Sequence, residues 1–98
     1  MKSIIQADKE RCYLCRRNNS CENLDEHHVF FGPYRAKSEK YGLKVYLHHQ
    51  RCHLDGVHRN SEVCRMVQER VQQIAMKYYG WTEDEFRSMF GRSYLEDL

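Results

Sequence analysis

Two short stretches in the first half of the chain have the pattern and composition of β-strands. Residues 26–31 contain β-branched and aromatic side chains, and Gly32-Pro33 ends the stretch. Residues 43–47 alternate apolar and polar side chains, a period of two that is typical of a strand. Residues 34–41, between them, are compatible with a helix, and Gly42 is placed to end it. We therefore expect the second strand to pair back on the first.

The second half of the chain begins with a long segment that has the period of an amphipathic helix. Asn60 or Ser61 can cap this helix, which we predict to run to about Tyr79, and Gly80 ends it. One face of the predicted helix is mostly apolar, and we assign it to core packing rather than to a cofactor. The residues of that face are Val63, Met66, Val67, Arg70, Val71, Ile74 and Ala75.

A shorter helix is predicted to follow. Thr82 and Glu85 have the spacing of a capping box, in which each side chain binds a free backbone N–H of the other residue. The helix is expected to reach about Phe90, because Gly91 comes directly after it. Two strands followed by helices predict a small α+β protein.

Length and hydropathy limit the class of protein further. A chain of 98 residues makes one domain with a small core, so a bound structural metal is a plausible additional source of stability. No apolar run approaches the ~20 residues that a membrane span needs. Residues 1–10 hold two isoleucines where a secretion signal needs a longer apolar core. We expect a cytoplasmic protein with no membrane partner.

The cysteines and one histidine predict a structural metal site. Five cysteines are an odd number, which argues against a framework made only of disulfides. Cys12 and Cys15 have C-x-x-C spacing, and His49 and Cys52 repeat that spacing downstream. Zinc prefers four tetrahedral ligands from Cys and His, commonly supplied as two short-spaced pairs. We predict that these four residues bind one structural Zn²⁺.

Three alternatives to this assignment stay open. His48 lies four residues before Cys52 and can displace His49, and Cys21 can compete as a ligand. The first C-x-x-C pair can also belong to a thiol–disulfide enzyme. In such enzymes a helix normally follows the pair, whereas here a polar loop follows it. Cys64 lies among the apolar positions of the long predicted helix, and we expect it to be a small buried hydrophobe.

The remaining histidines predict a second metal centre. His27 and His28 are adjacent in a predicted strand, where neighbours point to opposite faces. One ring can therefore bind a metal while the other reaches a substrate. His53 directly follows a predicted zinc ligand, and His58 lies five residues later, past Gly56. A set of imidazole ligands suits Zn, Ni, Co or Mn better than Mg, which would need water and phosphate oxygens as well.

The net charge of +2 conceals an uneven distribution. Residues 11–59 carry nine Lys or Arg and five Asp or Glu, whereas residues 60–98 carry five and seven. The positive half also holds the histidines, and Lys and Arg near phosphates release counterions when a protein binds nucleic acid. A merely soluble surface explains so small an excess equally well. The candidate phosphate-binding residues are Arg35, Lys37, Arg51 and Arg59.

Together these motifs resemble the HNH endonuclease family, the ββα-metal nucleases built on a zinc-stapled treble clef, and especially its small phage-type members. The resemblance rests on the C-x-x-C pair, on Glu26-His27-His28-Val29, and on Leu47 followed by residues 49–53 and His58. It covers roughly residues 12–59, with residues 60–98 as a helical extension. It implies one HNH-like domain, residues 1–98, with a short β-hairpin and a helix around the metal.

The resemblance also implies a function and roles for single residues. The family consists of metal-dependent DNA endonucleases and nickases, which hydrolyse phosphodiester bonds. His28 would be the general base, and His27, His53 and His58 would bind one catalytic divalent ion, Mg²⁺, Mn²⁺, Ni²⁺ or Zn²⁺. The implied partners are DNA and phage packaging or replication proteins, in the cytoplasm of a bacterial host. The alternative is a non-catalytic zinc module that binds DNA or a protein partner.

Overall fold

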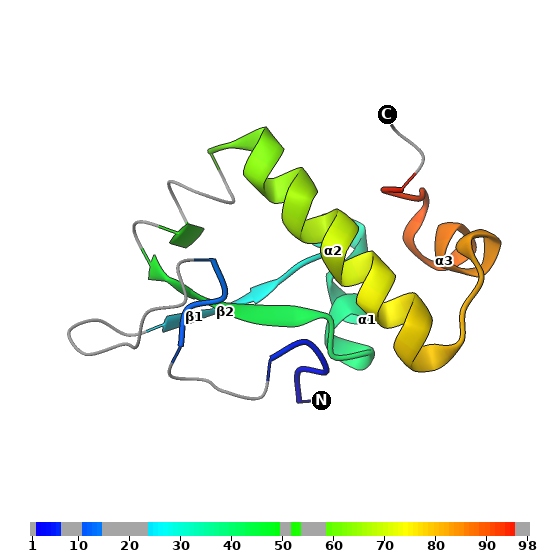
Figure 1. The fold of residues 1–98 in the computed structure, drawn as a ribbon, viewed down its shortest axis with the longest axis horizontal. Helices are drawn as coiled ribbons and strands as arrows, with labels where there is room; N and C mark the ends of the chain where they lie inside the picture. The colour runs from blue at the N-terminus through cyan, green and yellow to red at the C-terminus, as the bar shows by residue number, and fades with distance from the viewer. Residues whose placement is uncertain (1, 7–10, 15–23, 50–51, 54–58, 96–98) are drawn as a thin grey trace.

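The computed structural model describes residues 2–6, 11–14, 24–49, 52–53 and 59–95 (Figure 1). Within them the chain forms a two-stranded sheet, three α-helices and a short 3₁₀-helix, an α+β arrangement that confirms the predicted class. The elements in chain order are β1 (Leu24–His28), η1 (Gly32–Tyr34), α1 (Arg35–Lys40), β2 (Lys44–His48), α2 (Ser61–Tyr79) and α3 (Glu83–Phe90).

The two strands pair antiparallel, which confirms the prediction that the second folds back on the first. β1 lies earlier in the chain than predicted and ends at His28. After it, the Val29 N–H donates to the Leu43 carbonyl (3.0 Å), and the Phe30 N–H donates to Ser38 Oγ (3.3 Å). Because Leu43 directly precedes β2 and Ser38 belongs to α1, this segment is held both by the second strand's side of the sheet and by the helix.

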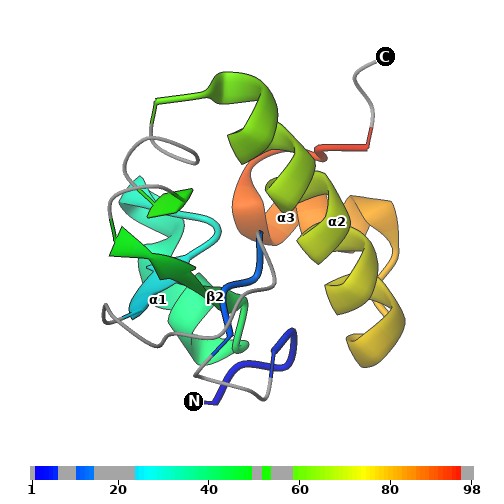
Figure 2. The same ribbon diagram turned by 60° about the vertical axis from the view of Figure 1, so that its left-hand side comes forward.

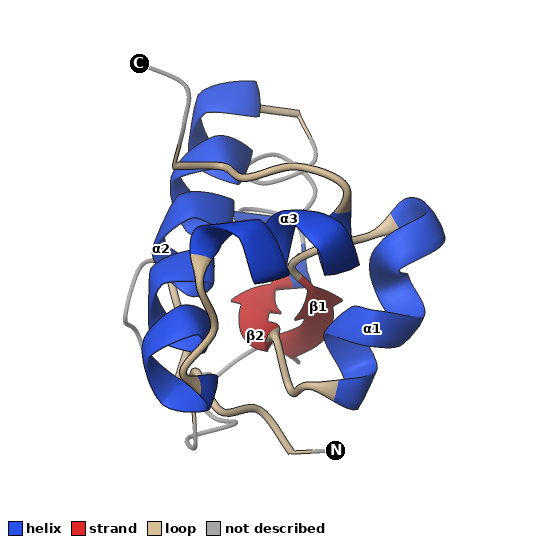
Figure 3. Ribbon diagram, turned by 90° about the vertical axis from the view of Figure 1, so that its right-hand side faces the viewer, coloured by secondary structure: helices blue, strands red, loops and turns tan. Residues whose placement is uncertain are grey.

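The helices surround the sheet and enclose the core. Figure 2 shows α3 beside α2, and Figure 3 shows the two strands end-on with α1, α2 and α3 around them. Phe30 is buried at the centre, with its ring centroid 5.3 Å from that of Phe86, 4.9 Å from Phe90 and 5.3 Å from Tyr94. The residues that directly follow β1 therefore anchor the C-terminal helix to the sheet.

The predicted ends of α2 and α3 are confirmed. Asn60 is the N-cap of α2, and its side chain accepts hydrogen bonds from two backbone N–H groups. Gly80 ends α2 in the left-handed conformation, with φ of 74°. Thr82 and Glu85 form the capping box of α3, and Gly91 ends that helix.

The buried face of α2 differs from the predicted one at several positions. Met66 and Arg70 are exposed, whereas Gln72 is fully buried. The Gln72 amide donates to Ser93 Oγ (2.9 Å) and accepts from the Tyr94 N–H (2.7 Å), so the C-terminal segment satisfies its polar groups. The buried apolar residues of α2 are Val67, Val71 and Ala75. No helix in the described ranges is both long and apolar enough to cross a membrane.

Residues 2–6 lie against β2 and the turn before it. The Ile4 N–H donates to the Gly42 carbonyl (3.0 Å), and Ser3 Oγ donates to the Lys44 carbonyl (2.5 Å). These bonds satisfy backbone carbonyls of β2 and of the turn before it, so the N-terminal segment protects an edge of the sheet.

Gly42 and Gly32 form a matched pair for testing this packing. Both have positive φ, 71° and 63°, but a Cβ at Gly42 would lie 2.4 Å from the Lys2 carbonyl oxygen, whereas one at Gly32 meets nothing within 4 Å. We expect Gly32→Ala to cost about 1 kcal/mol of unfolding free energy from backbone strain. Gly42→Ala should cost about 2–4 kcal/mol, because overpacking is added to that strain. Urea unfolding followed by circular dichroism measures both, and equal losses would contradict the packing of residues 2–6.

Candidate metal centres

Two thiols and an imidazole meet at the end of β2. The donor atoms of Cys12, His48 and Cys52 all lie within 4.8 Å of one another, and all three residues are buried. Cys52 Sγ is 3.9 Å from His48 Nδ1. The Tyr13 N–H donates to the Tyr46 carbonyl (2.8 Å), which ties the segment carrying Cys12 to β2. A sulfur and nitrogen donor set this compact can hold a metal ion.

The structure brings His48, the alternative to His49 in the predicted ligand set, to the two thiols. Neighbouring residues at the end of a strand point in different directions. His48 is 2% exposed, whereas the side chain of His49 is 61% exposed. The fourth predicted ligand, Cys15, lies three positions after Cys12 and outside the described residues.

His49 and His53 converge instead on a carboxylate of β1. Asp25 Oδ2 lies 2.6 Å from His49 Nδ1 and 2.8 Å from His53 Nδ1. Burial would raise the pKa of Asp25, but the hydrogen bonds with His53 and His49 outweigh burial and lower the pKa below its usual value. Asp25 is therefore ionised at neutral pH, as a metal ligand must be. The three donor atoms lie within 4.8 Å of one another.

His27 approaches this group from the same strand. Asp25 and His27 are two residues apart on β1, so their side chains share one face of the sheet. The ring of His27 is 4% exposed, and its centroid lies 5.0 Å from that of His53. A cavity of about 220 Å³ is lined by Glu26, His27, His28, Phe31, Arg35 and His53. Three of the four histidines predicted for the second centre therefore meet at one cavity.

The remaining candidate residues have other surroundings. Arg35 lines that cavity, whereas Lys37 Nζ donates to the Met89 carbonyl (2.7 Å) and so joins α1 to the end of α3. Arg59 is exposed, just before the N-cap of α2. Cys64 is half-buried on α2, and burial raises the pKa of its thiol. The candidates Cys21, Arg51 and His58 lie outside the described residues.

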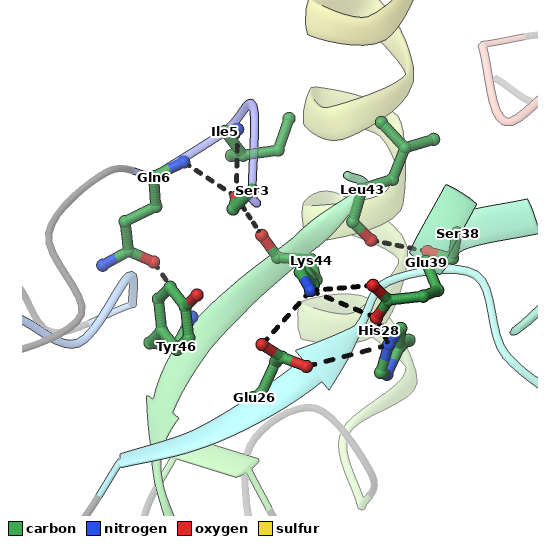
Figure 4. Close-up of polar contacts among 10 residues, drawn as sticks. All are labelled: Ser3, Ile5, Gln6, Glu26, His28, Ser38, Glu39, Leu43, Lys44 and Tyr46. Carbon is green, nitrogen blue, oxygen red and sulfur yellow. Dashed lines mark hydrogen bonds and ion pairs between the residues drawn. The ribbon is translucent and has the colours of Figure 1, made fainter. Parts of the chain in front are cut away.

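A third polar group surrounds His28 (Figure 4). His28 Nε2 lies 2.8 Å from Glu39 Oε1 and 3.9 Å from Glu26 Oε1. Lys44 is opposite His28 in the sheet, and its Nζ lies 3.1 Å from both carboxylate oxygens of Glu39 and 3.3 Å from Glu26 Oε2. Burial would lower the pKa of Lys44, but the hydrogen bonds with Glu39 and Glu26 outweigh burial and raise the pKa. Lys44 therefore stays charged inside the group.

The sequence carried signals for some residues that its interpretation missed. Asp25 stands two residues before His27, the spacing that puts two strand residues on one face. His49 stands four residues before His53, a spacing that brings side chains together over a helical turn. Glu39 had no such signal, because it reaches His28 only through the placement of α1 against the sheet.

Replacing each of the two adjacent histidines separates their roles. We expect His48→Ala to lower the free energy of unfolding in zinc buffer by about 3 kcal/mol, roughly a quarter of what a structural zinc contributes. His49→Ala should change it by less than about 1 kcal/mol, because an exposed ion pair is worth little. Thermal unfolding with and without a chelator measures both variants. A loss confined to His49→Ala would contradict the ligand set that contains His48.

The three groups differ in the chemistry that their atoms permit. The thiol and imidazole group suits a structural ion, and the carboxylate and imidazole group suits an ion that takes part in hydrolysis. In the third group, the ammonium of Lys44 already contacts both carboxylates. No family model, no curated protein and no solved structure matches this chain.

Proposed function

We propose that this protein is a divalent-metal-dependent endonuclease or nickase that hydrolyses phosphodiester bonds of DNA. The observation that carries the proposal is the cavity lined by His27, His28, His53 and Arg35. It combines imidazoles that can bind a metal or take a proton with a guanidinium that can hold a phosphate. Phosphodiester hydrolysis needs all three of these functions within one small space.

Asp25, His49 and His53, whose donor atoms lie within 4.8 Å of one another, would hold the catalytic ion. His27, whose ring lies beside that of His53, would be a further ligand. Their donor set, one ionised carboxylate with imidazoles, fits Mn, Ni, Co or Zn, and fits Mg if water and phosphate oxygens complete the shell. The ion would neutralise charge that develops on the scissile phosphate and the leaving oxygen. His49 and His53 bond the same carboxylate oxygen, so Asp25 brings both imidazoles together.

His28 is the proton acceptor in this proposal. It lies at the end of β1, next to the predicted ligand His27, and it lines the same cavity. An imidazole can accept a proton from water near neutral pH, which makes the water a better nucleophile. Arg35, at the start of α1, lines the cavity too and would bind a non-bridging phosphate oxygen.

A structural Zn²⁺ is proposed at Cys12, His48 and Cys52, with Cys15 as the fourth ligand. His48 is the last residue of β2, and Cys52 directly precedes His53 in the chain. A chain of 98 residues has only a small core with which to fix the segment that carries His53. A metal bound at this group would therefore fix that segment.

Plasmid nicking with defined metals tests the two roles separately. We expect Asp25→Asn to raise the Mn²⁺ concentration needed for half-maximal nicking at least about tenfold, because it removes a charged ligand. The matched control is Asp84→Asn, an exposed carboxylate on α3. His28→Ala should leave that concentration unchanged and lower the maximal rate by about 10²- to 10⁴-fold, the usual contribution of a general base.

Two outcomes would contradict these assignments. Equal nicking by the wild type and His28→Ala would remove His28 as the base. A wild-type protein that binds DNA but does not nick it with Mg²⁺, Mn²⁺, Ni²⁺ or Zn²⁺ would favour the alternative, a non-catalytic zinc module.

A further inference from the structure

His28 lines two cavities and contacts a carboxylate in the wall of one of them. It lines the cavity of about 220 Å³ that also contains His27, His53 and Arg35. It also lines a second cavity, of about 560 Å³, whose wall includes Glu39 of α1. His28 is 9% exposed, and its Nε2 lies 2.8 Å from Glu39 Oε1. A nitrogen-to-oxygen distance of this length is typical of a charge-assisted hydrogen bond.

The chemistry of this bond decides which ring nitrogen carries the hydrogen. An ionised carboxylate has lone pairs and no hydrogen, so it can only accept. His28 Nε2 must therefore donate to Glu39, and the neutral ring then has its lone pair on Nδ1. A carboxylate that holds one nitrogen of a histidine fixes the ring orientation as well as the tautomer.

Lys44 keeps Glu39 in the form that this bond requires. Its Nζ contacts both oxygens of Glu39 at 3.1 Å and Glu26 Oε2 at 3.3 Å (Figure 4). Lys44 is 5% exposed, and a buried ammonium depends on such partners for its charge. An ammonium has hydrogens to donate and no lone pair, so both carboxylates that it contacts act as acceptors.

The same contacts argue against a metal ion in this third group. Glu26, His28 and Glu39 have donor atoms close enough to bind one, within 4.8 Å of one another. Lys44 already contacts both carboxylates with a positive charge. A divalent ion beside that ammonium would meet strong repulsion at short range. The group is therefore better suited to hold a histidine than to hold a metal.

We propose that Glu39 is a positioning residue, which sets the tautomer of His28 so that Nδ1 is the proton acceptor, and that Lys44 locks Glu39 in place. The inference rests on the proposed function for its catalytic meaning, because His28 is the base there. During the reaction Nδ1 would take a proton from the water whose oxygen bonds to phosphorus as the bond from phosphorus to the leaving oxygen breaks. Nε2 would keep its own hydrogen and continue to donate it to Glu39. The imidazolium so formed would be stabilised by the negative charge of Glu39.

The direct test is the tautomer of His28, read by NMR from the ring nitrogen shifts in ¹⁵N-labelled, zinc-loaded protein. The wild type should show hydrogen on Nε2 when the ring is neutral. In Glu39→Gln, Lys44 would take the amide oxygen and leave the NH₂ group facing Nε2. Because that group donates, the ring hydrogen should move wholly or partly to Nδ1.

Kinetics supply the second readout. Glu39→Gln should lower kcat for nicking by about 10- to 100-fold, part of the 10²- to 10⁴-fold that a general base contributes, with KM nearly unchanged. Glu39→Asp keeps a carboxylate and should recover most of the rate. Glu69→Gln, the same change on α2 outside the group, is the matched control and should leave both kcat and the tautomer unchanged.

The outcomes separate this inference from the proposed function. A wild-type ring with its hydrogen on Nδ1 would overturn the inference without any variant, even if Glu39→Gln failed to fold. Unchanged tautomer and unchanged kcat in Glu39→Gln would overturn it as well. If the wild type shows no nicking, the proposed function fails, and the NMR result alone then decides whether Glu39 positions His28.

Discussion

The antiparallel pairing of β1 with β2 is the constraint on which every candidate site depends. Its register sets Leu24 opposite His48 and His28 opposite Lys44. Each polar group takes at least one member from these strands. The strands supply His48 to the group with two thiols, Asp25 to the group with His49 and His53, and both His28 and Lys44 to the group with Glu39. A slip of one residue would turn every side chain of one strand to the other face. All three groups would then be lost together.

The same strands serve stability and chemistry with different residues. Phe30, two residues past β1, packs against Phe86 and Phe90, and burial of such rings is the main source of stability in a small domain. Lys44 and its carboxylates contribute little, because desolvation offsets most of the attraction in a buried ion pair. Keeping a buried lysine next to His28 is therefore easier to explain by the positioning of that ring than by stability.

Features of the fold and of the sites were predictable from the sequence where they depend on interactions between neighbouring residues. They were not predictable where they depend on residues far apart in the chain. The caps at Asn60 and Thr82 are local, and so both helix starts were predictable from a few neighbouring residues. The strand pairing was also predictable, because alternation and turn residues are local signals. The choice of His48 over His49 was not, because one residue of register decides which ring turns inward. Glu39 reaches His28 through the docking of α1, which no local pattern encodes.

The most direct test of the two proposed metal centres is a cobalt(II) titration of the metal-free protein, followed by visible absorption. The pairing of the strands predicts two binding events in one chain. One should give the thiolate-to-cobalt charge-transfer band of a tetrahedral site that contains sulfur. The other should add d–d absorption from a site of carboxylate and imidazole ligands, without further thiolate absorption. A single equivalent, or a thiolate band that grows through both equivalents, would contradict two separate centres assembled by β1 and β2.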